Sequence, residues 1–272
     1  MNWKDIIDLH SHIGFYRGTE HTPDDWLRRM DRNGIGRAMV LHFMSGLVER
    51  QDFAQANDYV RKAVHSHPDR FIGMCVVSPL HGRFATEEFD RCVENGFSGL
   101  KLDPAKHGPF SLRSEVVREL MRRAGSHNVI VFIHSDFNSP VCTPYEVVAL
   151  AASFPNVKMI LGHFGLDQER CMLVPSIVRQ TKNLFLDTSQ TPDNPVSIYI
   201  SPIEEVGISR LVFGSDAPLI SPEVNLKKLE VAMDLYNLRI EDARAILRDN
   251  ACSLLAGVPN VLWDVPNKER SV

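Results

Sequence analysis

The chain has 272 residues, of which 44% are hydrophobic and 24% charged, as is typical of a soluble globular protein. Its formal net charge of -4 gives no electrostatic reason to expect nucleic acid or an anionic membrane as a partner. No stretch approaches the roughly 20 apolar residues that a membrane-spanning helix needs. We therefore expect neither nucleic-acid binding nor membrane insertion.

The cysteines and the start of the chain indicate the compartment. Five cysteines, an odd number, contain no Cys-x-x-Cys pair, so a disulfide framework is not expected. The first residues lead directly into an apolar run that carries Asp8 and lack the layout of a signal peptide. We expect a cytoplasmic protein. The oligomeric state is not visible in the sequence, and a homo-oligomer stays open.

Short apolar, β-branched runs recur along the whole chain and predict eight strands. Near-continuous apolar runs are typical of a parallel sheet that is covered on both faces. The runs begin 27 to 34 residues apart, close to the roughly 30 residues of a strand–helix–strand unit. They are Ile6–His12, Arg37–Phe43, Phe71–Ser78, Ser98–Asp103, Val129–Asp136, Val157–Phe164, Leu184–Ser189 and Leu211–Asp216.

The stretches between these runs carry the punctuation of helices. Thr22 followed by Pro23 offers an N-cap and a proline at the first helical position, and Gly34 marks the end of that helix. A later helix is predicted to open at Thr86 and to close at Gly96. Strands therefore alternate with amphipathic helices.

Eight strand–helix units without a change in composition predict one domain over residues 1–272. The expected fold class is α/β, as a closed (β/α)₈ TIM barrel rather than an open doubly wound sheet. No Gly-x-Gly-x-x-Gly follows the first strand, which removes the main support for dinucleotide binding. Residues 240–256 predict an additional C-terminal helix, and a tail follows from Gly257.

Polar residues stand at the carboxyl ends of the predicted strands, which meet at one mouth of a parallel barrel where active sites form. The first strand carries His10 and His12, whose side chains share a face because strand side chains alternate. The fifth strand carries His134 and the eighth Asp216. Three imidazoles and a carboxylate predict a site for one divalent ion, with Zn²⁺ expected and Mn²⁺ or Fe²⁺ as alternatives.

A second His-x-His pattern provides a comparison. His65 and His67 have the same spacing, but they lie at the end of a predicted helix, just before Pro68. Two rings at that spacing on a helix diverge, so we interpret this pair as a surface feature.

The strand-end motifs resemble those of the amidohydrolase superfamily, in particular its amidohydrolase-related branch. The resemblance covers all eight predicted strands, from Asp8-Leu9-His10-Ser11-His12 to Phe213-Gly214-Ser215-Asp216-Ala217-Pro218. It implies that the metal ligands are His10, His12, His134 and Asp216. It also implies that the histidine on the sixth strand, His163, stays off the ion and acts on the substrate.

The resemblance and the ligand set together predict hydrolysis of an amide, lactone or ester bond in a small molecule. A divalent ion lowers the pKa of a bound water from 15.7 toward roughly 7. Asp216 is expected to accept the proton of that water and to return it to the leaving group. His163 is expected to polarise the carbonyl and hold the developing oxyanion.

Two other functions stay open. Relatives in the same branch decarboxylate small aromatic or enol substrates without oxidation, although they tend to be longer, with larger insertions after the strands. A binding or sensor protein would keep the metal without turnover. A purely structural metal is usually enclosed by protein ligands, which disfavours this last interpretation because His163 stays free.

Lys101, on the fourth strand, shares a face with Asp103. As a plain ammonium it would bind a substrate carboxylate or pair with an acid, and this is the interpretation we adopt. Some superfamily members instead carry a carbamylated lysine here that bridges two metals. Further candidates for binding an anionic substrate follow the strands at Tyr16, Arg17, His42, Lys106, His107 and Arg170.

Overall fold

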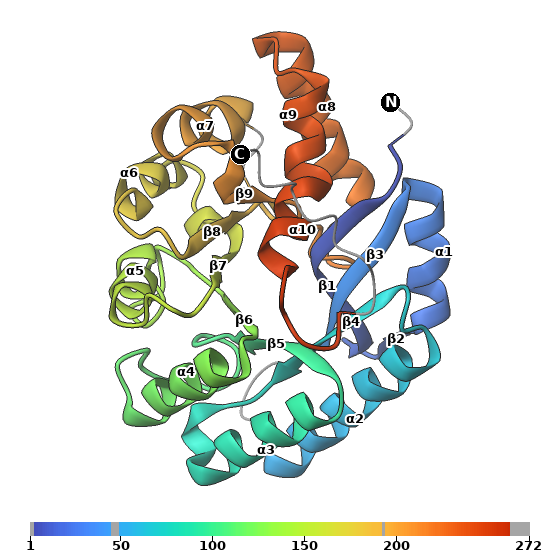
Figure 1. Ribbon diagram of the computed structural model, residues 1–272, viewed down its shortest axis with the longest axis vertical. Coiled ribbons are helices and arrows are strands. Elements are labelled where there is room, and N and C mark those ends of the chain that lie inside the picture. The colour runs from blue at the N-terminus through green and yellow to red at the C-terminus, as the bar shows by residue number, and fades with distance from the viewer. Residues whose placement is uncertain (1–2, 45–48, 192–193, 262–272) are drawn as a thin grey trace, which may run out of the picture.

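Eight parallel strands pair in chain order in the computed structural model of the protein, which describes residues 3–44, 49–191 and 194–261. Helices surround them, and the arrangement is the predicted α/β TIM barrel (Figure 1). A ninth strand, β2 (Thr19–His21), was not predicted; it pairs antiparallel with the end of the first strand. The parallel strands are β1 (Ile6–Tyr16), β3 (Ile35–His42), β4 (Phe71–Val76), β5 (Phe97–Leu102), β6 (Ile130–Ile133), β7 (Met159–Leu161), β8 (Leu184–Asp187) and β9 (Leu211–Val212).

Helices connect consecutive parallel strands, as the repeating sequence pattern predicts. The segment 240–256 is helical as expected, although its central turn (Ala245–Asp249) is a π-helix between α9 (Ile240–Arg244) and α10 (Asn250–Leu255). Within the described ranges no helix is both long and apolar enough to cross a bilayer. The other helices are α1 (Pro23–Asn33), α2 (Arg50–Ser66), α3 (Arg83–Glu94), α4 (Glu115–His127), α5 (Pro144–Ser153), α6 (Val174–Val178), α7 (Ser201–Val206) and α8 (Pro222–Tyr236).

The predicted helix boundaries are right for α1 and wrong for the start of α3. Thr22 caps α1 through its side chain, which accepts a hydrogen bond from the backbone of Asp25, and Gly34 ends the helix in the left-handed conformation. Helix α3 begins at Arg83, three residues before the expected start. Thr86 lies inside its first turn, where its hydroxyl donates to the carbonyl of Arg83 rather than capping the helix.

A bulge in β1 decides which of its side chains point into the barrel. Ile7 and Leu9 belong to a hydrophobic cluster with inward-facing residues of the other strands. The pairing of β1 with β3 shifts register between Asp8 and Ser11. Asp8 pairs with Ala38 and Ser11 with Val40, so β1 advances by three residues where β3 advances by two. The extra residue reverses the alternation, so His10 also faces the barrel interior, toward the mouth.

The C-terminal helix closes one end of the barrel. Ala251 and Leu255 of α10 join the cluster that Ile7 and Leu9 form inside the strands. In Figure 1, α10 lies across the amino ends of the strands. A larger cluster packs the outer side of the strands against the surrounding helices. The site-bearing end is thus left as the open one, as in other barrels of this type.

The two edges of the sheet meet along a seam between β1 and residues 213–217. The amide of Leu9 donates to the carbonyl of Phe213 at 3.0 Å. At the mouth, the amide of His12 donates to the carbonyl of Ala217, and the amide of Asp216 donates to the carbonyl of His10, both at 2.7 Å. These bonds bring the first and last strands together at the predicted ligands.

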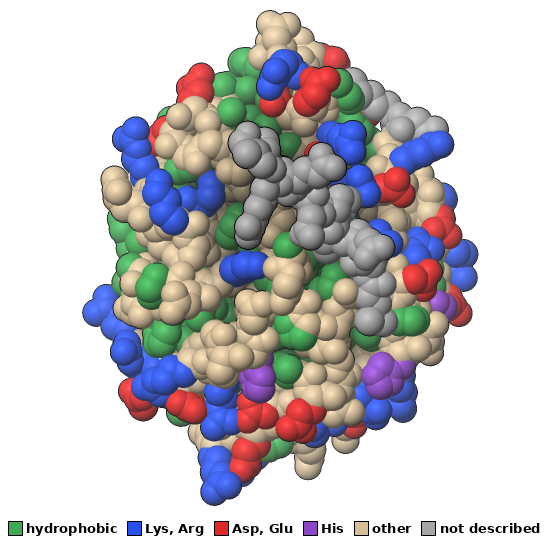
Figure 2. All heavy atoms as spheres, viewed as in Figure 1, with side chains coloured by type: hydrophobic (Ala, Val, Ile, Leu, Met, Phe, Trp, Pro, Cys, Tyr) green, Lys and Arg blue, Asp and Glu red, His purple; other side chains and the backbone are tan. Residues whose placement is uncertain are grey.

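Charges of both signs are interspersed over the face shown in Figure 2, which is the face seen in Figure 1. No large patch of one sign covers it. This distribution accords with the small net charge of -4 and gives no footprint for a polyanion on that face.

Replacing Thr22 by alanine removes the side-chain oxygen that caps α1 and should lower the free energy of unfolding by about 1 kcal/mol. Thr22→Ser keeps the hydroxyl and serves as the control. Urea denaturation of both variants measures the effect. Equal loss in the two variants would show that the methyl group, not the cap, carries the stability.

Candidate active site and metal centre

One cavity of about 170 Å³ lies at the carboxyl ends of the strands. It is lined by every residue that the sequence predicts as a ligand or catalytic group, and by Lys101. The nominated residues in its lining are His10, His12, Lys101, His134, His163 and Asp216.

Two imidazoles converge on a single carboxylate oxygen. Nε2 of His12 lies 2.9 Å from Oδ1 of Asp216, and Nε2 of His10 lies 3.4 Å from the same atom. Among the described residues these three side chains form one of two groups whose geometry could hold a metal ion. His10 and Asp216 are buried, whereas 11% of the His12 side chain is exposed toward the cavity.

His134 follows β6 directly and faces the same cavity, but it is not a member of either group. Its ring centroid lies 5.0 Å from that of His163, which in turn lies 5.1 Å from that of His10. Its Nδ1 lies 3.8 Å from a carboxylate oxygen of Asp103. The structure therefore brings His134 to the neighbourhood, and its role as a fourth ligand stays a prediction.

Burial sets the protonation states of the site. Desolvation lowers the pKa of His10, His12, His134 and His163, so these rings are neutral and their lone pairs can bind a cation. Burial raises the pKa of Asp216, but the positive charge that His10 and His12 would carry if protonated, together with the hydrogen bond from His12, outweighs it and holds that pKa well below its usual value. An ionised carboxylate therefore lies beside neutral imidazoles.

Several backbones around the cavity adopt conformations that L-residues rarely take. His163, in the turn Gly162–Leu166 after β7, has φ of 64°. Asp216 after β9 has φ of 57°, and Gln190 after β8 has φ of 49° and donates from its side chain to Asp216. Each such residue costs about 1–3 kcal/mol and persists only where its surroundings enforce it, and such residues cluster at functional sites.

Lys101 is buried inside the site. Its Nζ lies 3.0 Å from Nε2 of His10 and 4.0 Å from the centre of the Phe132 ring. Burial lowers its pKa to about 8, while the nearby charge of Asp103 opposes that shift. Both contacts suit an ammonium group, which donates to a lone pair and lies over an aromatic face. A carbamylated Lys101 that bridges two metals stays the less favoured alternative.

The sequence interpretation missed Asp187 and Ser189, which lie at and just after the end of β8. The carboxylate of Asp187 is buried, and its Oδ2 lies 3.3 Å from Nδ1 of His10. Asp187, His10 and His163 form the second group whose geometry could hold an ion. The alternation along 184–189 places residues 187 and 189 on one face. The rule that polar residues at the carboxyl end of a predicted strand face the mouth, applied to the seventh run (Leu184–Ser189), predicts both residues.

The donors present fit a divalent cation. The 3.4 Å between Nε2 of His10 and Oδ1 of Asp216 joins two electron-rich atoms, which a cation between them would stabilise. Nδ1 of His10 faces the Asp187 carboxylate, the arrangement that usually orients a metal-binding imidazole. Nδ1 of His12 is buried and has no hydrogen-bond partner in the described part of the chain.

Three of the loop residues proposed as contacts for an anionic substrate line the cavity, namely Tyr16, Arg17 and Lys106. The other three do not. His42 contacts the carbonyl of Phe43, and Arg170 pairs with Asp167 at 2.6 Å. The remaining one, His107, is buried outside the lining.

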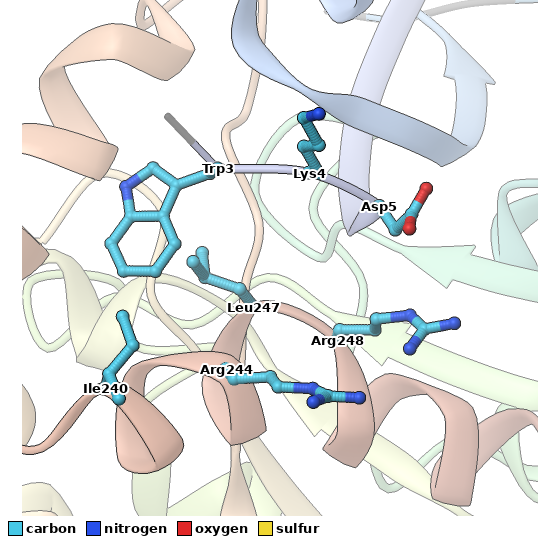
Figure 3. Close-up of a pocket in the computed structure, with 7 residues that line it drawn as sticks. All are labelled: Trp3, Lys4, Asp5, Ile240, Arg244, Leu247 and Arg248. Atoms are coloured by element: carbon cyan, nitrogen blue, oxygen red, sulfur yellow. The ribbon is translucent and has the colours of Figure 1, made fainter. Parts of the chain in front are cut away.

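A larger cavity of about 390 Å³ lies away from the histidines (Figure 3). Its lining comes from residues that precede β1 and from the C-terminal helical segment. Trp3 stands over Ile240, and the side chains of Arg244 and Arg248 extend in the same direction. Trp3 also packs against the outer hydrophobic cluster, so residues of this cavity take part in packing the segment before β1 onto the barrel.

A sequence model of the amidohydrolase family matches residues 7–256, which is most of the chain. The protein therefore belongs to the amidohydrolase family, in the branch that the strand-end motifs indicated. The family is metal-dependent, in agreement with the His/Asp group at the mouth of the barrel. A search of curated proteins finds no significant match.

Solved structures share the fold at low sequence identity. A 2,6-dihydroxybenzoate decarboxylase from Rhizobium aligns with a TM-score of 0.71 and 19% identity, over 93% of this chain and 99% of that one. A Polaromonas dihydroxybenzoic acid decarboxylase with bound manganese and 2-nitroresorcinol gives 0.73 and 18%, over 96% and 100%. A probable 2-pyrone-4,6-dicarboxylic acid hydrolase from Acinetobacter baumannii gives 0.68 and 18%, over 93% and 99%. At these identities the likeness establishes the fold.

Protein purified without chelator should contain one divalent ion per chain by elemental analysis, and Asp216→Asn should lose most of it because the variant removes the anionic ligand. His65→Ala, at the exposed first histidine of the His-x-His pair at the end of α2, is the matched control and should keep the ion. Retention of a full equivalent by Asp216→Asn would place the ion elsewhere, with the Asp187 group as the next candidate.

The free energy of unfolding of the metal-free protein should depend on pH through Lys101, and the direction of that dependence follows from the pKa of this residue. Its pKa of about 8 in the folded state lies below the ordinary 10.5, so between these values only the unfolded chain binds the proton. Stability should therefore rise with pH across this window, by at most about 1.4 kcal/mol per pKa unit. The difference in unfolding free energy between wild type and Lys101→Met measures this rise.

Lys182→Met, at an exposed position, is the control for that titration. Its unfolding free energy should run parallel to that of the wild type from pH 8 to 10.5. A difference between wild type and Lys101→Met that stays flat or falls across the window would contradict an ammonium destabilised by burial.

Proposed function

We propose that this protein is a metal-dependent hydrolase that cleaves an amide, lactone or ester bond of a small molecule. The observation that carries the proposal is the convergence of His10 and His12 on the ionised carboxylate of Asp216 inside a small, largely buried cavity. We assign the ion to these side chains and to His134, with Zn²⁺ as the expected metal. When bound, it would supply a water of lowered pKa as nucleophile.

Asp216 supplies the base in this proposal. Its carboxylate is held ionised at the mouth of the barrel, with Oδ1 directed at both imidazoles of β1. It would accept the proton of the attacking water and return it to the leaving group, so one residue acts first as base and then as acid.

His163 supplies a contact to the substrate in this proposal. Its ring is buried and neutral, and its Nδ1 is engaged by Ser189, which leaves Nε2 for the substrate. Because both groups that face Nδ1 are acceptors, the ring proton belongs on Nδ1; Nε2 would then bind the substrate as an acceptor and could take up a proton from it, and it would not donate to the oxyanion as the sequence led us to expect. Positioned groups of this kind typically contribute 10²- to 10⁴-fold to turnover.

Non-oxidative decarboxylation is the second candidate, and two observations favour it. Two of the similar structures are named as decarboxylases of dihydroxybenzoates. Decarboxylation also needs a proton donor for the new carbanion, and Lys101, with a pKa of about 8, is a protonated group inside the cavity. The hydrolase from Acinetobacter shares the same fold, so the reaction has to be decided on the products.

Metal-loaded protein should hydrolyse at least one member of a panel of small lactones, esters and amides, and carboxylated aromatic compounds should release no carbon dioxide. Product analysis by mass spectrometry together with a carbon dioxide assay separates the two reactions. Carbon dioxide release without hydrolysis would reassign the protein as a decarboxylase. No turnover of either kind with the ion fully bound would favour a sensor.

His163→Asn should lower turnover about 10²- to 10⁴-fold while the metal content stays at the wild-type level, because the proposal places this ring on the substrate and not on the ion. Steady-state kinetics with parallel elemental analysis measures both. His65→Asn, on the surface, should change neither. Loss of the ion in His163→Asn would make His163 a ligand.

A further inference from the structure

Two polar side chains from the end of β8 lie behind two of the site histidines at once. Oγ of Ser189 lies 3.1 Å from Nδ1 of His10 and 3.0 Å from Nδ1 of His163. Oδ2 of Asp187 lies 3.3 Å from the same atom of His10 and accepts the hydroxyl proton of Ser189. All four residues are buried, so water does not compete for these bonds.

The direction of these hydrogen bonds follows from counting protons. Ser189 has one hydroxyl proton and gives it to the carboxylate of Asp187, so its oxygen can only accept from the two rings. The carbonyl oxygen of Ser189, 3.4 Å from Nδ1 of His163, is also an acceptor and nothing else. Nδ1 must therefore carry the proton in both neutral rings.

We infer that Asp187 and Ser189 form a tautomer clamp, which holds His10 and His163 with the proton on Nδ1 and directs both Nε2 lone pairs into the cavity. Asp187 and Ser189 are positioning residues, because in this arrangement they act only through the two rings. The clamp deepens the proposed function, and only its consequences for metal binding and turnover rest on that function.

A contact on the other side of His10 supports this assignment independently. The ammonium of Lys101, which has protons to donate and no lone pair, lies 3.0 Å from Nε2 of His10. That nitrogen must accept, so the proton of the neutral ring is on Nδ1, as the clamp requires. Two sets of contacts, on opposite sides of one ring, thus give the same tautomer.

Gly214 provides the space in which the clamp fits. It follows β9, and a Cβ atom built on it would lie 2.1 Å from Oδ1 of Asp187 and 2.9 Å from Cβ of His10. The first contact is with a carboxylate held by its bonds to Ser189, and the second is with the first side-chain atom of a strand residue. A side chain at 214 would push Asp187 and His10 apart.

Ring-nitrogen NMR of ¹⁵N-histidine-labelled, chelator-treated protein tests the clamp without metal or substrate. The wild type should show His10 and His163 as neutral rings protonated on Nδ1, assigned with His10→Asn and His163→Asn. Ser189→Ala removes the shared acceptor, so the His163 ring should shift its proton wholly or in part to Nε2. An unchanged tautomer in Ser189→Ala, or Nε2 protonation in the wild type, would overturn the inference.

Thr188→Val is the matched control. Thr188 is the adjacent buried residue, and its hydroxyl has no hydrogen-bond partner in the described ranges, so the variant removes a buried oxygen at almost the same place. Its histidine spectrum should equal that of the wild type. A tautomer change in Thr188→Val as large as in Ser189→Ala would reduce the effect to disturbed packing and overturn the clamp.

Gly214→Ala reaches the clamp from its other side and is used if Ser189→Ala does not fold. It should move the Asp187 carboxylate away from Nδ1 of His10 and shift the ¹⁵N resonance of that nitrogen, while Lys101 keeps the tautomer; wild-type spectra from a folded Gly214→Ala would contradict the inference. In metal-loaded protein, Ser189→Ala should bind the ion 10- to 100-fold more weakly. A tautomer change without any detectable metal or turnover would leave the clamp standing and remove the proposed function.

Discussion

The seam between β1 and residues 213–217 is the constraint on which the site depends. His12 and Asp216 are held by reciprocal backbone bonds of 2.7 Å across it, through the carbonyls of Ala217 and His10. Because backbone atoms make these bonds, the side chains of both edges are delivered to one point whatever their chemistry. The convergence of two imidazoles on one carboxylate oxygen is thus a consequence of closing the barrel.

Burial is the common cause of the electrostatics at this point. It lowers the pKa of the imidazoles and would raise that of Asp216, yet the mutual proximity of these groups keeps the carboxylate charged. A buried anion beside neutral lone pairs is costly without a cation, and the same arrangement becomes favourable once one is bound. The site is therefore organised for a charge of +2, and the ammonium of Lys101 lies at its edge.

The same architecture supports different reactions because only a small part of the fold contacts a substrate. Similar structures are named both as decarboxylases and as a hydrolase, although each covers more than nine-tenths of this chain. Strands and helices set the positions of the ligands, whereas the groups around a bound carbonyl or carboxylate come from a few side chains and loops. Lys101, His163 and Arg17 line the cavity in this protein.

The sequence alone determined the eight strands and the surrounding helices, since apolar runs and helix caps are local signals that recur at a constant spacing. It also placed His10, His134 and Asp216 at strand ends, which in a parallel barrel is enough to predict a shared mouth. The same rule, applied to the seventh run (Leu184–Ser189), also predicts Asp187 at the mouth.

Only the tertiary structure decided how these residues meet. The bulge after Asp8 turns His10 inward beside Leu9. It depends on the register between β1 and β3, and no residue type in this segment indicates it. The tautomers of His10 and His163 depend on Ser189, which is 179 positions from His10 in the chain. Such contacts exist only after the barrel closes, because no local preference of either segment specifies a partner so far away.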